Sequence, residues 1–348
     1  MPIPSEILVK IFSLTSISFV LAILATPLWT SFLYRNKLGK NIRNDGTTPL
    51  FSKLHESKKG TPTMGGVLIW GTLALITITL WAGDRILNLD YFHYFNFLTR
   101  KETLLPFGAL MGAALVGLVD DILDIKKLGH KGQGIRFRLK VWLYILVAAI
   151  GAWWFYFKLG FDAIHLPFAG TLTLGWLFIP FFILTVVATS FAVNQTDGLD
   201  GLAGGTLLLA FFAFAIIAFV QGKENLASFI GVICGGLLAF LWFNVYPARF
   251  FMGDTGSMAL GVALAIVAFL TNSILLLPII GLIFVAEAAS TIIQIASKKF
   301  FKKKVFLSSP IHHHFEAIGW PETKVTMRFW IIGSVASIIG VIIFFLDR

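Results

Sequence analysis

Three carboxylates end an apolar run in the stretch GLVDDILDIKK, residues 117–127. Asp120 and Asp124 are four residues apart, and Asp121 and Asp124 are three apart, so on a helix the three line one broad face. Like charges in this arrangement repel one another unless a cation or several donors lie between them. Oxygen ligands favour a hard cation such as Mg²⁺, which commonly bridges substrate phosphates. The alternative is a solvated helix end, with the two lysines that follow as counter-charges.

A second polar stretch, NQTDGLDG, supplies Asn194, Asp197 and Asp200 where an apolar run begins. Glycines let the backbone approach a ligand closely, and a helix N-terminus offers free N–H donors. An ordinary helix cap would explain one of these acids. It does not explain two acids and an asparagine together, so we predict a binding role. The stretch lacks both the preceding strand and the G-x-G-x-x-G pattern of a dinucleotide site.

A third stretch, FFMGDTGS, holds Asp254 between two glycines directly before another apolar run. A carboxylate in a glycine turn is a good metal ligand, because nothing bulky shields it. An N-cap for the following helix is nearly as good an interpretation of this turn alone. The nearby Asn244 could donate to a base or a sugar. Phe250 or Phe251 could stack on a ring, or either could anchor the chain at the membrane interface.

The stretch PIHHHFE carries three consecutive histidines, His312, His313 and His314. Consecutive side chains cannot all face one way, so a three-histidine metal cage is not expected. Imidazoles beside a phosphate can donate hydrogen bonds or carry a proton near neutral pH. The alternative is that they are exposed loop residues.

Glu287 lies inside an apolar run, in the stretch FVAEAAS. An acid within a membrane-spanning segment is costly and is by default a site candidate. Packing against Ser290 or Gln294 explains it equally well.

The elements that must position these residues are apolar helices. The 348-residue chain is 57% hydrophobic and 13% charged, whereas a soluble domain is about a quarter charged. Ten apolar runs each approach the ~20 residues that a spanning helix needs: 7–33, 64–82, 104–120, 139–157, 174–193, 202–220, 226–243, 257–271, 275–297 and 328–346. We therefore predict an all-α, polytopic integral membrane protein with about ten transmembrane helices, in a single domain, residues 1–348.

The basic residues predict the orientation of these helices. Of the 28 lysines and arginines, 21 fall in loops that follow odd-numbered runs. Basic loops remain in the cytoplasm, so both termini should lie outside. The net charge of +10 is then mostly a matter of topology, and nucleic acid is not indicated as a partner. The polar stretches all fall on the cytoplasmic face, which predicts one composite active site at the inner membrane surface.

Carboxylates, histidines and lysines at a membrane surface, with Mg²⁺, suit the transfer of a phosphorylated group onto a lipid. No serine–histidine–acid set supports acyl transfer. An intramembrane prenyltransferase is the rival enzyme, because it also uses two acidic motifs with Mg²⁺. A lipid or nucleotide transporter is the non-enzymatic rival, but it predicts mid-membrane acids and a two-fold repeat, which the sequence does not clearly show.

Five stretches together resemble the bacterial phospho-N-acetylmuramoyl-pentapeptide transferase family. In chain order they are GTPTMGG (60–66), DDILD (120–124), NQTDGLDGLAGG (194–205), FFMGDTGS (250–257) and PIHHHFEAIGWPETKVTMRFW (310–330). The first four also suit the wider superfamily of polyprenyl-phosphate hexosamine-1-phosphate transferases, and the histidine loop points to the muramoyl branch. The resemblance implies ten helices in the bacterial cytoplasmic (inner) membrane. It also implies that UDP-N-acetylmuramoyl-pentapeptide and undecaprenyl phosphate, with Mg²⁺, give lipid I and UMP.

The resemblance implies three catalytic carboxylates, Asp120, Asp121 and Asp254. Asp254 and Asp121 would hold Mg²⁺, and Asp120 would deprotonate or position the lipid phosphate. It also implies a substrate-binding set: Lys58, Asn194, Asp197, Asp200, Asn244, Phe251, His312, His313 and His314. In that set Asp200, Asn244 and Phe251 would hold uridine, while the histidines would line the diphosphate region.

Two positions depart from the family pattern. Phe191 stands where the family usually has asparagine, and Gln195 where it usually has leucine. The stretch before His55 is also longer than usual, so either Lys58 or Lys59 could be the matching lysine. The oligomeric state stays open, with a homodimer as one alternative.

Overall fold

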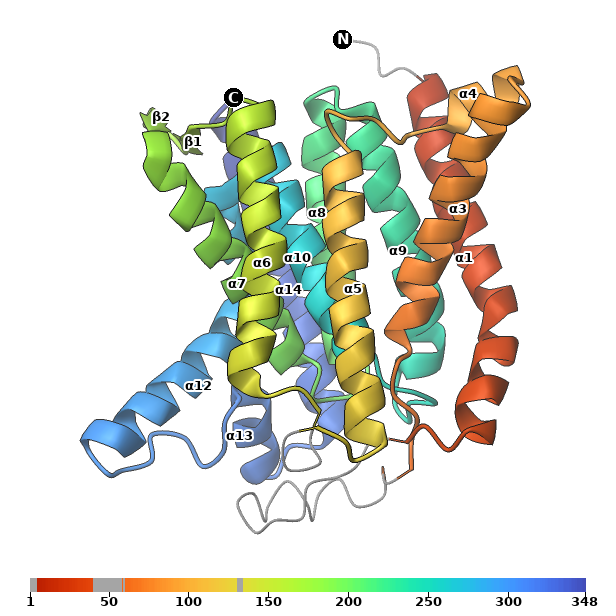
Figure 1. Cartoon of the computed structure of the whole chain (residues 1–348). Coiled ribbons are helices and arrows are strands. Elements are labelled where there is room, and N and C mark those ends of the chain that lie inside the picture. Colours follow the sequence, from red (N-terminus) through yellow and green to blue (C-terminus); the bar gives the residue numbers. More distant parts are fainter. Residues whose placement is uncertain (1–4, 40–57, 59, 130–133) are drawn as a thin grey trace.

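The protein is a bundle of long helices (Figure 1). The computed structural model describes residues 5–39, 58, 60–129 and 134–348. The long helices are α1 (Ser5–Arg35), α3 (Gly66–Ile86), α5 (Leu104–Ile125), α6 (Phe137–Trp153), α7 (Phe178–Thr196), α8 (Leu202–Val220), α9 (Glu224–Asn244), α10 (Asp254–Leu270), α12 (Leu282–Phe300) and α14 (Glu322–Leu346). Short elements join them: α4 (Asp90–Phe95), η3 (Trp154–Lys158), η4 (Gly175–Leu177), η5 (Ile274–Leu276), α11 (Leu277–Ile280) and α13 (Ile311–Ala317). Strands β1 (Ala163–Leu166) and β2 (Gly170–Thr173) form an antiparallel hairpin with Ala163 opposite Thr173.

All ten predicted apolar runs are helical over most of their length, which confirms the polytopic, all-helical membrane fold. Within the described residues, eight helices are long and apolar enough to cross a membrane. The ninth run is broken instead, because the segments Ile274–Ile280 and Leu282–Phe300 meet at an 80° bend. The eighth run forms α10, which has only 17 residues.

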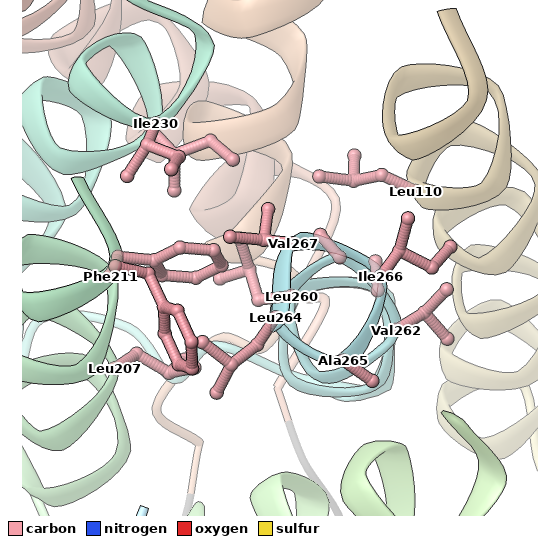
Figure 2. Packing of buried hydrophobic residues seen from close by; sticks show 14 of the residues in the cluster. Leu110, Leu207, Phe211, Ile230, Leu260, Val262, Leu264, Ala265, Ile266 and Val267 are labelled. Atoms are coloured by element: carbon pink, nitrogen blue, oxygen red, sulfur yellow. The ribbon is translucent and has the colours of Figure 1, made fainter. Parts of the chain in front are cut away.

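Helix α10 lies at the centre of the bundle. Every residue from Thr255 to Leu270 is buried. Figure 2 shows the side chains around it, which include Leu110 of α5, Leu207 and Phe211 of α8 and Ile230 of α9. A helix that is apolar on all sides belongs inside a protein. Since protein and not lipid surrounds it, α10 need not match the ~30 Å of the bilayer core. The first residue of α10, Asp254, is thereby held in a fixed position relative to the surrounding helices.

Glycines bring α3 and α5 against the first turn of α10. A Cβ at Gly66 of α3 would lie 2.2 Å from Gly256 Cα. A Cβ at Gly117 of α5 would lie 2.5 Å from the carbonyl oxygen of Asp254. Larger residues would force the helices apart, so these positions let the carboxylates of α5 reach the start of α10.

A short run of backbone hydrogen bonds ties the chain before α3 to the chain before α10. Phe251 N donates to Pro62 O at 2.8 Å, and Gly65 N returns a bond to Phe251 O at 2.8 Å. Gly66 N then donates to Met252 O at 2.9 Å. Two segments that are almost two hundred residues apart in the sequence thus share one surface.

The described polar stretches gather at one end of the bundle. The loops that follow α5, α7, α9 and α12 lie at the lower end in Figure 1, while the start of α1 and the C-terminus lie at the upper end. These loops carry four of the five stretches. The fifth, GTPTMGG (60–66), joins them through its hydrogen bonds to the chain before α10, while residues 40–57 and 59 before it lie outside the described residues.

Candidate active site

A lysine lies between two of the predicted catalytic carboxylates. Lys140, in the first turn of α6, contacts the Oδ2 atom of Asp120 at the end of α5. The same ammonium lies 2.5 Å from Oδ2 of Asp254 at the start of α10. All three side chains are largely buried, and buried charges need partners. The cation that the acidic cluster requires is therefore supplied, in this structure, by the chain itself.

The second oxygen of each carboxylate is also held. Asn194 Nδ2 donates to Asp254 Oδ1 at 2.9 Å and lies 2.9 Å from the hydroxyl oxygen of Ser257. The backbone N–H of Ile135 donates to Asp120 Oδ1 at 2.6 Å. Four segments of the chain therefore meet at this cluster, which we call the aspartate–lysine centre: Asp120, Lys140, Asn194 and Asp254.

Asp121 supports this centre from behind. Its Oδ1 accepts a hydrogen bond from Asp254 N at 3.2 Å, and its Oδ2 accepts one from Thr255 N at 3.0 Å. It therefore caps α10 from a neighbouring helix. The capping role that the sequence left open for Asp254 falls to Asp121. Asp254 can turn its carboxylate to Lys140 for that reason.

Asp197 holds the residue before Asp254. Gly253 N donates to Asp197 Oδ2 at 3.2 Å. Gly253 has a φ of 76°, a conformation that side-chain-bearing residues rarely adopt. A Cβ there would also lie 2.6 Å from Asp121 Oδ2. Glycine at this position thus lets the carboxylates of Asp121 and Asp197 accept hydrogen bonds from the backbone of this turn.

Lys58 belongs to a second charged cluster. Its Nζ lies 2.7 Å from Asp200 Oδ1 and 2.5 Å from Glu322 Oε1. Glu322 also accepts a hydrogen bond from Asp200 N at 2.6 Å. Ala248 N donates to Asp200 Oδ2 at 2.9 Å. This cluster joins the segment before α3 to the loops before α8, α10 and α14. The alternative lysine, Lys59, lies outside the described residues.

Asn244 and Phe251 lie beside this second cluster. The amide of Asn244 accepts from Gly201 N at 3.0 Å and donates to Phe250 O at 2.8 Å, so it joins two loops. Phe250 is fully buried against Phe240 and cannot stack on a ligand. Phe251 is only partly buried, and its ring centre lies 5.8 Å from Lys58 Nζ. Of the two phenylalanines, Phe251 is therefore the one placed to meet a ligand.

The three histidines point to three different partners. His312 Nδ1 lies 2.9 Å from Glu287 Oε2, and His313 Nδ1 lies 2.7 Å from Glu316 Oε2. His314 Nδ1 accepts a hydrogen bond from Leu307 N at 3.2 Å. No two of them share these partners, as expected for consecutive side chains.

Sequence reasoning assigned no site role to two of these residues. Lys140 is one of the 21 basic residues that follow odd-numbered runs, and Glu322 lies in the stretch 310–330 without a pattern that marks it. Lys140 lies one residue inside the predicted run 139–157, and a charge there was itself a signal of function. Glu322 gave no comparable signal, because an acid in the first turn of a helix is ordinary.

The two departures from the family pattern lie near the aspartate–lysine centre. The ring of Phe191 packs edge-on against Tyr144 at 6.0 Å and Phe137 at 5.6 Å. Phe191 thus fills an aromatic cluster where an asparagine would donate hydrogen bonds. Gln195 Oε1 is buried and has no hydrogen-bond partner within the described part of the chain.

The sequence matches one protein-family profile and one family signature. The profile for Glycosyl transferase family 4 matches residues 103–272, which include all four residues of the aspartate–lysine centre. Phospho-N-acetylmuramoyl-pentapeptide-transferase signature 1 matches residues 58–69.

Similar curated proteins match almost the whole chain. The phospho-N-acetylmuramoyl-pentapeptide-transferase of Chloroflexus aurantiacus is 40% identical over 94% of this chain and 88% of its own length. The protein of the same name from Geobacillus kaustophilus is 41% identical over 94% of this chain and 96% of its own length. A third protein of this name, from Shouchella clausii, is 41% identical over 94% of this chain and 95% of its own length.

Proposed function

Because this chain belongs to the phospho-N-acetylmuramoyl-pentapeptide-transferase family, we propose that it uses UDP-N-acetylmuramoyl-pentapeptide and undecaprenyl phosphate as substrates. The products are lipid I and UMP. The chain is an enzyme, a multi-pass membrane transferase that moves the phospho-N-acetylmuramoyl-pentapeptide group. The main support for the substrates is the likeness over 94% of the chain to relatives that carry this name.

The aspartate–lysine centre suits direct transfer between the two substrates. An oxygen of the lipid phosphate forms a bond to the phosphorus on the sugar side of the diphosphate, and the bond from that phosphorus to the bridging oxygen breaks. UMP leaves with the electron pair of the broken bond. Asp120 takes the proton of the lipid phosphate or positions it, and the Lys140 ammonium neutralises phosphate oxygens. Positioning and charge neutralisation are the main requirements of phosphoryl transfer.

The acidic residues fit a Mg²⁺ ion. Mg²⁺ usually takes one or two carboxylates and fills its remaining positions with water and substrate phosphates. A site of two carboxylates is the arrangement that fits this preference. We assign it to Asp254 with Asp121 beside it, because hydrogen bonds hold both carboxylates at the start of α10. Bound Mg²⁺ would neutralise the charge that develops on the diphosphate.

The remaining substrate contacts are assigned to the loops around this centre. Asp200, Asn244 and Phe251 hold the uridine, next to Lys58. Asn194 and Asp197 support the turn that carries Asp254. His312, His313 and His314 line the diphosphate region. The closeness of Lys58 to Phe251 and Asp200 supports this grouping.

We also propose ten membrane crossings in the bacterial cytoplasmic membrane, with the aspartate–lysine centre facing the cytoplasm. The bent segment and the short α10 then supply the two crossings beyond the eight long helices. An even number of crossings agrees with the two ends of the described chain lying on the same side of the bundle (Figure 1).

The orientation can be tested with single cysteines in a Cys234→Ser background. Asn88→Cys lies in the loop after α3, and Lys303→Cys lies in the loop after α12; both positions are exposed. In right-side-out spheroplasts, an impermeant maleimide should label Asn88→Cys at once and Lys303→Cys only after permeabilisation. The reverse labelling pattern would place the aspartate–lysine centre outside the cell and contradict the proposed cytoplasmic orientation.

The donor substrate can be tested with two labelled nucleotide sugars. Purified enzyme with undecaprenyl phosphate and Mg²⁺ should move label from UDP-N-acetylmuramoyl-pentapeptide into a butanol-extractable lipid and release UMP. UDP-N-acetylglucosamine lacks the lactyl-peptide arm and should be at least ~10²-fold poorer in kcat/KM, as expected for loss of several polar contacts. Efficient transfer from UDP-N-acetylglucosamine would leave only the wider superfamily assignment standing.

A further inference from the structure

Glu287 and His312 form a buried pair to which the reaction above gives no combined role. Glu287 lies in α12, past the bend, and His312 lies in α13, next to α12 in Figure 1. Their side chains are 0% and 1% exposed, and Nδ1 of the imidazole lies 2.9 Å from Oε2 of the carboxylate. Ser290 and Thr291 donate to the backbone carbonyl of Glu287 and not to its carboxylate. Among the described residues, the imidazole is the partner of this acid.

The proton count of the pair determines what the other edge of the imidazole can do. A buried carboxylate that keeps a net negative charge is costly. The pair can be neutral overall in two ways. Either an ionised Glu287 faces an imidazolium, or a protonated Glu287 donates to Nδ1 of a neutral imidazole. In both arrangements Nε2 carries a hydrogen, so Glu287 keeps His312 as a hydrogen-bond donor at Nε2.

This Nε2 edge meets the polar turn before α8. A Cβ added to Gly198 would lie 2.3 Å from Nε2, so only glycine leaves room for the imidazole. Gly198 lies between Asp197, which holds the turn of Asp254, and Asp200, which pairs with Lys58. Nε2 is buried and has no hydrogen-bond acceptor among the described residues. A buried donor without an acceptor is costly, which favours an acceptor supplied from outside the protein.

We propose that Glu287 is a positioning residue for His312. It holds the imidazole with Nε2–H against the Gly198 turn, where a phosphate oxygen of the nucleotide donor accepts the hydrogen bond. Glu287 itself touches no substrate. The identity of the acceptor rests on the proposed function, whereas the protonation of Nε2 does not.

A double-mutant cycle tests whether Glu287 acts through His312. Glu287→Gln keeps the shape of the side chain, but its amide can pair with either tautomer of the imidazole. The amide oxygen accepts from a protonated Nδ1, and the amide nitrogen donates to an unprotonated one. Loss of the fixed donor should lower kcat and kcat/KM together by about tenfold or more. His312→Asn, whose amide can still donate to Glu287, should cost at least as much. In the His312→Asn background, Glu287→Gln should cost nothing further; if the two losses multiply instead, Glu287 acts independently and the proposal is wrong.

A second measurement does not depend on turnover. In ¹⁵N-histidine-labelled, full-length enzyme, the resonances that disappear in His312→Asn belong to His312, and its Nε2 should be protonated. An unprotonated Nε2 in the wild type would overturn the proposal whatever the turnover of the variants. A wild type that transfers no muramoyl group would instead contradict the proposed function and leave the protonation result standing. Glu224→Gln, in α9 at the far end of the bundle, is the matched control and should keep its activity.

Discussion

Asp254→Asn is expected to lower kcat by ~10²-fold or more, the size of loss seen when one electrostatic group is removed from an active site. The substitution keeps the shape of the side chain and its contact with Asn194, but it removes the negative charge. The Lys140 ammonium would then be paired with Asp120 alone, and the proposed Mg²⁺ site would lose its main ligand. The measurement is transfer rate against Mg²⁺ concentration, in purified enzyme.

The control for this variant is Asp162→Asn, which makes the same chemical change beside the hairpin at the other end of the bundle. It should retain nearly all activity. Thermal denaturation of both variants checks that the fold is intact. A folded Asp254→Asn enzyme with near-wild-type kcat at saturating Mg²⁺ would show that the reaction does not need the charge of Asp254.

Lys140→Gln is expected to produce two opposite effects. First, kcat should fall by ~10²-fold, because the ammonium that neutralises phosphate oxygens is lost. Second, the Mg²⁺ concentration that gives half-maximal activity should decrease. In the wild type, the carboxylates of Asp120 and Asp254 share the Lys140 ammonium. Without it the two carboxylates repel each other and attract a divalent cation more strongly.

Lys140→Arg is the useful companion variant. It keeps the charge but replaces a compact ammonium with a planar guanidinium, which does not fit the same position between two carboxylates. Its Mg²⁺ requirement should therefore stay close to that of the wild type while kcat falls. An unchanged Mg²⁺ requirement in Lys140→Gln would mean that lysine and metal do not compete for the same oxygens.

Much of the fold could be predicted from the sequence, because a membrane helix reports itself through its own composition. Each of the ten apolar runs is helical in the structure. The break in the ninth run was not predicted, since the residues around Gly281 are as apolar as a continuous helix would need. At the bend, a Cβ on Gly281 would lie only 2.9 Å from the carbonyl oxygen of Leu277.

The site was predictable as a set of residues but not as a set of partners. Asp120, Asp121 and Asp254 stood out because acids at membrane edges are rare. Which of them would cap α10 depended on the close approach of α5, and hence on Gly117, a residue that looks ordinary in an apolar run. The pairing of Lys140 with Asp254 joins helices that are far apart in the sequence, and that of Glu287 with His312 joins α12 to α13 across the loop between them. No local pattern encodes such pairings.

The enclosure of α10 has a consequence for how the enzyme is made. The helices α3, α5, α7 and α8, which pack against it, all come earlier in the chain. During synthesis, therefore, the slot for α10 can be complete before the ribosome has finished this helix. Asp120, Lys140 and Asn194 are already in the membrane at that moment, and Asp254 joins them only when α10 docks. The aspartate–lysine centre is therefore completed only by the docking of α10. A nascent chain that ends before α10 lacks the last carboxylate of this centre.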